Sequence, residues 1–299
     1  MPVSFYGLLT ARKFYYRDGM IQIQNCALLV CALCIIYWVT IGVIKKWYMI
    51  DRPAFNLWTV YRYWAALVGL FSVVAIVRLM PELTWAVKKL GFVGSICESG
   101  GYFDGSSGYW AWLCAYFNLA EMCSSVLMVL QKRRVTKLHR FYHTMATLYH
   151  FLVYPENFAF FRWALISKLV IHAAMYCHSF VTASGYRVSR NVERLLAVAQ
   201  LLRFVFCQVV LLVIASFKLS PASEKCDSST WSVIVGSMVM YFVATLYYWR
   251  YFRRTHIDEA RRRRVDDKRH AVNHKSYVAH KREVKWILGD LESLVDMIG

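Results

Sequence analysis

Ionisable and polar side chains occur inside three long apolar stretches of the chain. They are Asn118, Glu121, Ser124 and Ser125 in one stretch, His139, Tyr142, His143 and His150 in the next, and Lys168, His172 and His178 in the third. Carboxylate, imidazole, phenol and amine groups are used by proteins for proton transfer and nucleophilic attack. Because such groups are costly at membrane depth, they mark a functional site or an internal pairing.

The spacing of these residues places them on shared faces of helices. Lys168 and His172 are four residues apart, and such residues lie on the same side of a helix. The same kind of spacing relates Glu121 to Ser124 and Ser125, and His139 to Tyr142 and His143. We therefore expect a polar chamber between neighbouring helices, in which Glu121 and Lys168 form an ion pair. The side chains expected to bond around this pair are His139, His143 and His172.

A metal site is the first alternative for so many histidines. Histidine-box di-iron enzymes of membranes carry more histidines, in several paired boxes, than this chain has at depth, so no metal is predicted. A lone buried histidine is more often a hydrogen-bonded core residue. The concentration of histidines here exceeds that simpler expectation.

The elements that position these groups are predicted to be membrane-spanning helices. Of 299 residues, 58% are hydrophobic and 18% charged, against about a quarter charged in soluble domains, and the mean hydropathy is +0.37. The apolar residues form runs of about 20, the length that crosses a bilayer as a helix. The predicted spans are 25–44, 58–80, 109–131, 139–154, 159–181, 194–217 and 231–252. The fold class is therefore all-α integral membrane, with about seven transmembrane helices between an N-terminal segment, 1–24, and a basic helical tail, 253–299.

The charges of the short loops predict the orientation. With the N-terminus outside, the inside loops 45–57, 132–138 and 186–193 are rich in Lys and Arg, and the tail also lies inside. Arg12, Lys13 and Arg17 are the exception to this pattern. The first 20 residues lack a long apolar core, so no cleavable signal peptide is predicted.

The net charge of +18 includes +4 from the tail and +14 from the membrane domain and its rims. Basic residues at such rims usually meet lipid headgroups, so membrane lipids are the expected partners and nucleic acid is not. The nine cysteines show no zinc-type spacing. Cys97 and Cys226 fall in outside loops and could form a disulfide.

The tail 253–299 is expected to contact a further surface. It contains four consecutive arginines at 261–264, and from Val284 to Met297 its apolar residues recur at helical spacing. An amphipathic helix of this kind needs a protein or membrane surface to cover it. Other subunits of a membrane complex are therefore predicted partners, and a solvated charged helix is the simpler alternative for the arginine-rich part.

At the polar residues the sequence resembles the fatty acid elongase (ELO) family, membrane condensing enzymes that start each round of very-long-chain fatty acid synthesis. The similarity is greatest to the branch that extends saturated sixteen-carbon chains. It is carried by Tyr109-Trp110-Ala111, Val129-Leu130-Gln131-Lys132, Leu138-His139, Ile171-His172-Ala173-Ala174-Met175-Tyr176 and Gly185-Tyr186-Arg187-Val188-Ser189-Arg190.

The departures from the family pattern fall on its functional positions. Asn118 stands where the family has Lys, and Lys168 where it has Asn. Ser124 replaces the Asp of the Glu-Leu-x-Asp-Thr motif, of which Glu121 is kept, and Tyr142 replaces the first of the paired histidines in the His-x-x-His-His box. The Tyr-x-Tyr-Tyr motif reads Tyr176-Cys177-His178-Ser179.

The resemblance implies the condensation of acyl-CoA with malonyl-CoA, with a histidine carrying the acyl group. That histidine maps onto Tyr142. Phenols in general are weak nucleophiles at neutral pH unless activated, because they hold their proton. Ser124 cannot act as the carboxylate that would orient a histidine. Catalytic groups that act as a unit fail together when one is lost.

We therefore predict a non-catalytic elongase-fold protein, a structural or lipid-holding subunit of a larger membrane complex, with no cofactor. The site is read as degenerate, with His143 and His172 as the residues expected to contact a lipid or acyl chain. Its residues are Glu121, Ser124, His139, Tyr142, His143, Lys168, His172 and Tyr176.

Two alternatives stay open for the function, and two for the organelle. One is a divergent, active elongase that uses acyl-CoA and malonyl-CoA, with His143 and His172 sharing the acyl-transfer role. The other is a sensor or carrier that keeps an acyl chain in the former substrate tunnel. The chain ends in Asp296-Met297-Ile298-Gly299 rather than a di-lysine retrieval signal, so both the mitochondrial inner membrane and the endoplasmic reticulum are retained as locations.

Overall fold

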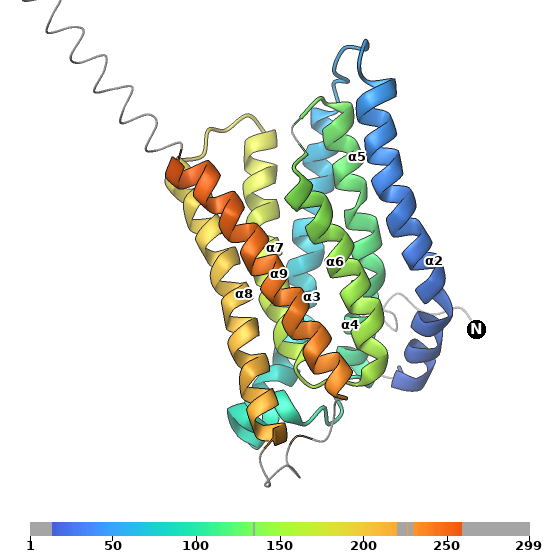
Figure 1. The fold of residues 1–299 in the computed structure, drawn as a ribbon, viewed down its shortest axis with the longest axis vertical. Helices are drawn as coiled ribbons and strands as arrows, with labels where there is room; N and C mark the ends of the chain where they lie inside the picture. The colour runs from blue at the N-terminus through green and yellow to red at the C-terminus, as the bar shows by residue number, and fades with distance from the viewer. Residues whose placement is uncertain (1–13, 134, 220–225, 227–229, 259–299) are drawn as a thin grey trace, which may run out of the picture. The chain divides into compact units, whose positions relative to one another are not determined.

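A computed structural model describes residues 14–133, 135–219, 226 and 230–258, and these residues form an all-α structure (Figure 1). The helices are α2 (Tyr16–Val43), α3 (Trp58–Cys97), α4 (Gly105–Glu121), α5 (Cys123–Leu130), α6 (Lys137–Val153), α7 (Phe161–Ala183), α8 (Arg190–Leu219) and α9 (Trp231–Phe252). Short π-helical turns follow α2 and α9, and a 3₁₀ turn follows α6. The chain divides into two compact units at Tyr248, and the first unit holds the bundle discussed below.

The membrane character predicted from composition is confirmed. Among the described residues, six helices are long and apolar enough to cross a bilayer: α2, α3, α4 together with α5, α7, α8 and α9. The predicted fourth span corresponds to α6, which has 17 residues and is shorter than these six. With α6 the bundle has the seven helical segments expected, in an integral membrane protein.

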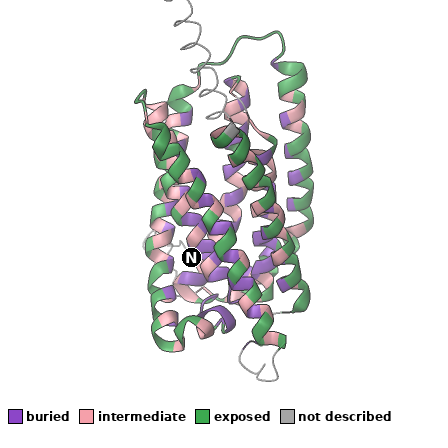
Figure 2. Ribbon diagram, turned by 60° about the vertical axis from the view of Figure 1, so that its left-hand side comes forward, coloured by how far each residue is buried: buried purple, intermediate pink, exposed green. Residues whose placement is uncertain are grey.

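The bundle carries apolar residues on the outside and polar residues within. Leu28 is 83% exposed, and Leu67 and Val239 are also exposed, whereas Glu121 is 3% exposed. Figure 2 shows this as exposed outer faces around a buried interior. Such an exterior suits lipid tails, because the bilayer is as apolar as leucine and does not penalise exposed hydrophobic side chains. The buried polar groups must therefore be paired with one another inside the bundle.

Helix α3 packs along α7, and their outer ends are locked together by a buried arginine that the sequence analysis did not single out. Arg162, fully buried, lies 3.1 Å from Glu82 Oε1. It also donates hydrogen bonds to the carbonyls of Ser95 and Ser99, at 3.0 and 2.6 Å. Gly91, with φ +71°, breaks the helical geometry of α3 before these carbonyls, a conformation that glycine adopts readily.

Cys97 and Cys226 form a disulfide, with 4.5 Å between their Cα atoms. It ties the end of α3 to the loop between α8 and α9, so the pairing that the loops allowed is confirmed. Disulfides persist in oxidising compartments. The bond therefore agrees with the assignment of this end of the bundle to the outside, opposite the basic loops.

Two helix boundaries differ most from the predicted spans. Helix α2 begins at Tyr16, before the predicted start at Asn25, and α3 continues to Cys97, beyond the predicted end at 80. Both extensions contain charged residues, which a search for apolar runs excludes. The amphipathic helix predicted at 284–297 lies outside the described residues.

Candidate functional site

Glu121 lies at a break between α4 and α5, in the interior of the bundle. The break is stabilised locally, because Ser124 Oγ donates a hydrogen bond of 2.7 Å to the Glu121 carbonyl. Serine hydroxyls compete with the backbone ladder in this way and favour bends. Ser124, predicted as a site residue, therefore supports the main chain at Glu121.

The Glu121 carboxylate has three basic neighbours. They are Lys168 and two of the three histidines that the sequence placed around the pair, His143 and His172. His172 Nδ1 lies 3.2 Å from Oε1, Lys168 Nζ 3.7 Å from Oε2, and His143 Nδ1 3.8 Å from Oε2. Lys168 also donates a hydrogen bond to Asn118 Oδ1. The predicted Glu121–Lys168 ion pair is confirmed, and it joins α4 to α7.

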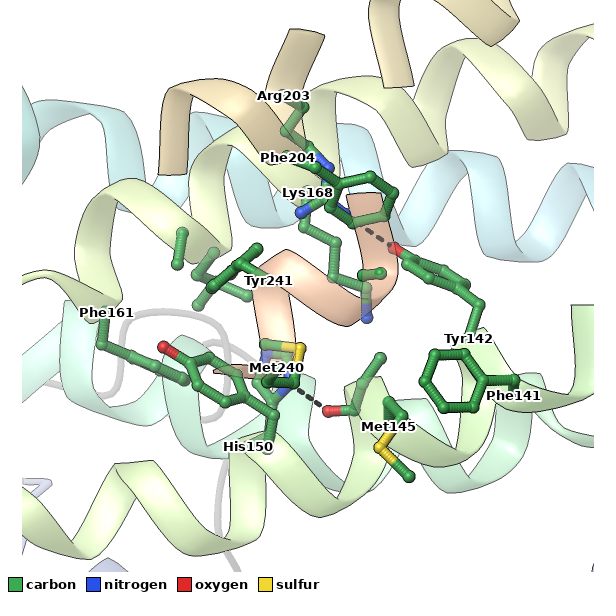
Figure 3. A pocket seen from close by; sticks show the side chains of 15 residues that line it. Phe141, Tyr142, Met145, His150, Phe161, Lys168, Arg203, Phe204, Met240 and Tyr241 are labelled. Carbon is green, nitrogen blue, oxygen red and sulfur yellow. Dashed lines mark hydrogen bonds between the residues drawn. The ribbon is translucent and has the colours of Figure 1, made fainter. Parts of the chain in front are cut away.

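A chain of polar contacts continues from Glu121 across the bundle. His172 holds the carboxylate through Nδ1, and its Nε2 lies 3.1 Å from the Tyr142 hydroxyl on α6. That hydroxyl accepts a hydrogen bond of 3.4 Å from Arg203 on α8. Figure 3 shows the Arg203–Tyr142 contact beside Lys168. One carboxylate, one imidazole, one phenol and one guanidinium are thus aligned from four helices.

His139 lies beside this line without joining it. The ring of His139 contacts that of His143, with centroids 4.5 Å apart, and His139 Nε2 is buried without a hydrogen-bond partner among the described residues. His139 therefore does not bond to Glu121 as expected. Its backbone is held by Thr136, which caps the start of α6.

Tyr176 and His178 lie in the C-terminal half of α7. The Tyr176 ring lies beside that of His172, with centroids 5.8 Å apart. His178 is not part of the cluster and lies 3.9 Å from Glu193. His150, two turns beyond His143 on α6, donates a hydrogen bond of 2.7 Å from Nδ1 to the Ala146 carbonyl. Among the described residues, no group of three or more His, Cys, Asp or Glu is arranged to hold a metal ion.

Two cavities adjoin the cluster. A narrow slot of about 30 Å³ is lined by Tyr142, Lys168 and Arg203 together with aromatic side chains (Figure 3). A groove of about 360 Å³ lies between α6 and α9. The two share Met145, Tyr149 and Met240 in their walls, so the slot beside Arg203 adjoins the groove.

Arg203 is the main residue of the site that the sequence analysis missed. It is 7% exposed and lies near the middle of α8, inside the predicted span 194–217. The sequence contained a signal for Arg203, because burying an arginine in an apolar span is as costly as burying a lysine such as Lys168. Its position beside Tyr142 could not be read from spacing, since α6 and α8 are far apart in the chain.

Comparisons with known proteins identify a family and several relatives. The profile of the family described as "ELO: GNS1/SUR4 family" matches residues 23–264. "Long chain fatty acid elongase 2" of Caenorhabditis elegans is 28% identical over 212 residues, which cover 71% of this chain and 77% of that protein.

Two further relatives match different lengths of the chain. "Long chain fatty acid elongase 1" of the same organism is 28% identical over 166 residues, 56% of this chain and 58% of that protein. "Very long chain fatty acid elongase 6" of Homo sapiens is 23% identical over 215 residues, 72% of this chain and 79% of that protein.

Proposed function

The chain belongs to the GNS1/SUR4 (ELO) family, and from this premise we propose that it holds an acyl chain in the membrane without condensing it. The observation that carries the proposal is the position of Tyr142. This residue occupies the place of the acyl-carrying histidine implied by the family resemblance, and its hydroxyl is bonded to both His172 and Arg203. At neutral pH a phenol is a weaker nucleophile than a neutral imidazole, so Tyr142 is a poor replacement for the histidine.

The Glu121–Lys168 ion pair supports the same proposal. In a membrane interior, a buried carboxylate and ammonium need each other whether or not a substrate is present. The pair therefore explains the presence of both residues without requiring a catalytic role. The adjoining cavities leave room for an acyl chain, as expected for a lipid-holding protein.

Active condensation is the second candidate, and the alignment of Glu121, His172 and Tyr142 favours it. The contacts of 3.2 and 3.1 Å resemble a carboxylate–histidine–hydroxyl triad. In that mechanism the Tyr142 oxygen would attack the acyl-CoA carbonyl and pass its proton to His172. The C–S bond would break, CoA thiolate would leave, and the acyl group would remain as a tyrosine ester. Decarboxylation of malonyl-CoA would supply the enolate that attacks this ester and releases Tyr142.

One assay separates the two candidates. The purified full chain is reconstituted in vesicles with palmitoyl-CoA and malonyl-CoA, and 3-ketoacyl-CoA is measured by mass spectrometry beside an active elongase. We expect no product above background, and acyl lipid co-purifying with the protein. Product formation that is lost in Tyr142→Phe, together with an acyl adduct on Tyr142, would establish condensation instead.

The proposal includes a place in a larger complex, reached through the tail 253–299. This segment lies outside the described residues beyond Asp258, so its partners stay a prediction, as does a mitochondrial location. Gentle extraction through an affinity tag, followed by native sizing, tests both. Recovery in a stoichiometric assembly of other membrane subunits is the expected result, and recovery alone or with the other enzymes of fatty acid elongation would contradict it.

A further inference from the structure

The polar cluster carries more positive than negative charge. Lys168 is paired with Glu121, but no carboxylate of the described residues lies within 4.0 Å of a nitrogen of Arg203. The nearby histidines can only add to this excess, since imidazole is neutral or positive. Arg203 therefore stands as a buried cation whose counter-charge is not supplied by the described part of the chain.

The described residues do not use all the N–H donors of Arg203. It donates to the Tyr142 hydroxyl at 3.4 Å, interacts with the Tyr241 phenol, and its guanidinium lies 4.4 Å from the centre of the Phe204 ring. Its Nε is buried with no hydrogen-bond partner among the described residues. A guanidinium has five N–H donors arranged to hold a carboxylate.

A small cavity lies beside Arg203, and a larger one adjoins it. The slot at Arg203, Lys168 and Tyr142, about 30 Å³, has room for about two waters, which is the scale of a carboxylate group. The groove of about 360 Å³ next to it is within the size range of small-molecule sites. Its walls are mainly apolar, with Leu148, Leu152 and Val233 beside the shared methionines.

We propose that this cavity binds a free long-chain fatty acid, with the carboxylate on Arg203 and the chain in the groove between α6 and α9. The proposal rests on the acyl-holding function and names its ligand class. The carboxylate supplies the negative charge that Arg203 lacks, which a neutral thioester or ester carbonyl cannot do. The slot is also too small for the nucleotide part of an acyl-CoA.

Binding to the wild-type full chain in detergent gives the first test. Palmitate, methyl palmitate and palmitoyl-CoA are compared by the shift in unfolding temperature and by native mass spectrometry. We expect palmitate to bind about tenfold or more tightly than methyl palmitate, the size of effect that a charged hydrogen bond supports. Equal binding of acid and ester would overturn the carboxylate proposal and leave the acyl-holding function standing.

Variants of α8 locate the binding site. Arg203→Gln should lose the preference for palmitate over its methyl ester, and Arg203→Lys should keep part of it. Arg194→Gln, an exposed residue in the first turn of the same helix, is the matched control and should bind as the wild type does. An unchanged preference in Arg203→Gln would overturn the assignment to Arg203. If that variant does not fold, the acid–ester comparison in the wild type decides. Formation of 3-ketoacyl-CoA, measured separately, would refute the non-condensing function without affecting this comparison.

Discussion

Lys168 donates a hydrogen bond to Asn118, and both residues lie beside Glu121 in the interior of the bundle. The family resemblance puts a lysine at position 118 and an asparagine at position 168. The two departures therefore exchange a lysine and an asparagine between α4 and α7. One ammonium and one amide stay near Glu121, so the case against condensation rests on Tyr142 and Ser124.

Reversing this exchange should leave Glu121 with an ammonium partner, now supplied from α4. Lys168→Asn alone removes the ammonium from Glu121, and loss of one partner of a buried ion pair costs about 3–5 kcal/mol. Adding Asn118→Lys should recover most of that loss, measured as thermal unfolding in detergent. A double variant no more stable than Lys168→Asn would show that the two positions do not substitute for one another.

The Glu121–Lys168 pair is expected to hold α4 against α7. Lys168→Met and Glu121→Leu should each lower the yield of folded protein, because each leaves an unpaired buried charge. The double variant should be more stable than either single one, since no charge is left over. If both single variants are as well folded as the wild type on size-exclusion chromatography, the pair has no structural role.

Restoring the missing catalytic groups tests what inactivated the site. Tyr142→His supplies the imidazole and Ser124→Asp the carboxylate that the family pattern contains. We expect the double variant to form 3-ketoacyl-CoA at about 10²-fold or more above the wild type, the scale of acid–base contributions. Neither single variant should reach this rate, because such groups act as a unit. A wild-type rate equal to that of the double variant would show that Tyr142 already serves.

Arg162 should be essential to the outer end of the bundle. Arg162→Met leaves Glu82 and two backbone carbonyls without their donor, at a cost of about 3–5 kcal/mol. Arg162→Met combined with Glu82→Gln should be less destabilised, because the uncompensated carboxylate is removed. Unfolding temperatures of the two variants check this, and a lower value for the double variant would contradict the pairing.

The Cys97–Cys226 disulfide should be present in the native protein and absent after reduction. Non-reducing peptide mapping should find the two cysteines joined, and a maleimide reagent should modify Cys226 only after reduction and unfolding. Cys226→Ser should cost about 2–5 kcal/mol of stability, the range for loss of a native disulfide. Cys177→Ser, at an exposed free cysteine, is the control and should change little. Free thiols at 97 and 226 in the native protein would place this end in a reducing compartment.

The membrane helices and the residues at their centre were predictable from the chain alone. Apolar runs of bilayer length reveal spans because every buried backbone group must bond within its own helix. The four-residue spacing of Lys168 and His172 placed them on one face of a helix. The free-energy cost of an ionisable side chain at membrane depth marked them as residues with a role. The Glu121–Lys168 ion pair followed, since a carboxylate in the third predicted span and an ammonium in the fifth have few other partners at membrane depth.

The tertiary structure alone decided which helices meet and at what height. Asn118 and Lys168, or Tyr142 and Arg203, are brought together by the rotation and translation of whole helices, and a pattern within one helix carries neither quantity. For the same reason His139 was expected at Glu121 but lies against His143 instead. Helix faces are local properties of a sequence, whereas contacts between faces depend on how side chains from distant segments fill the space between them.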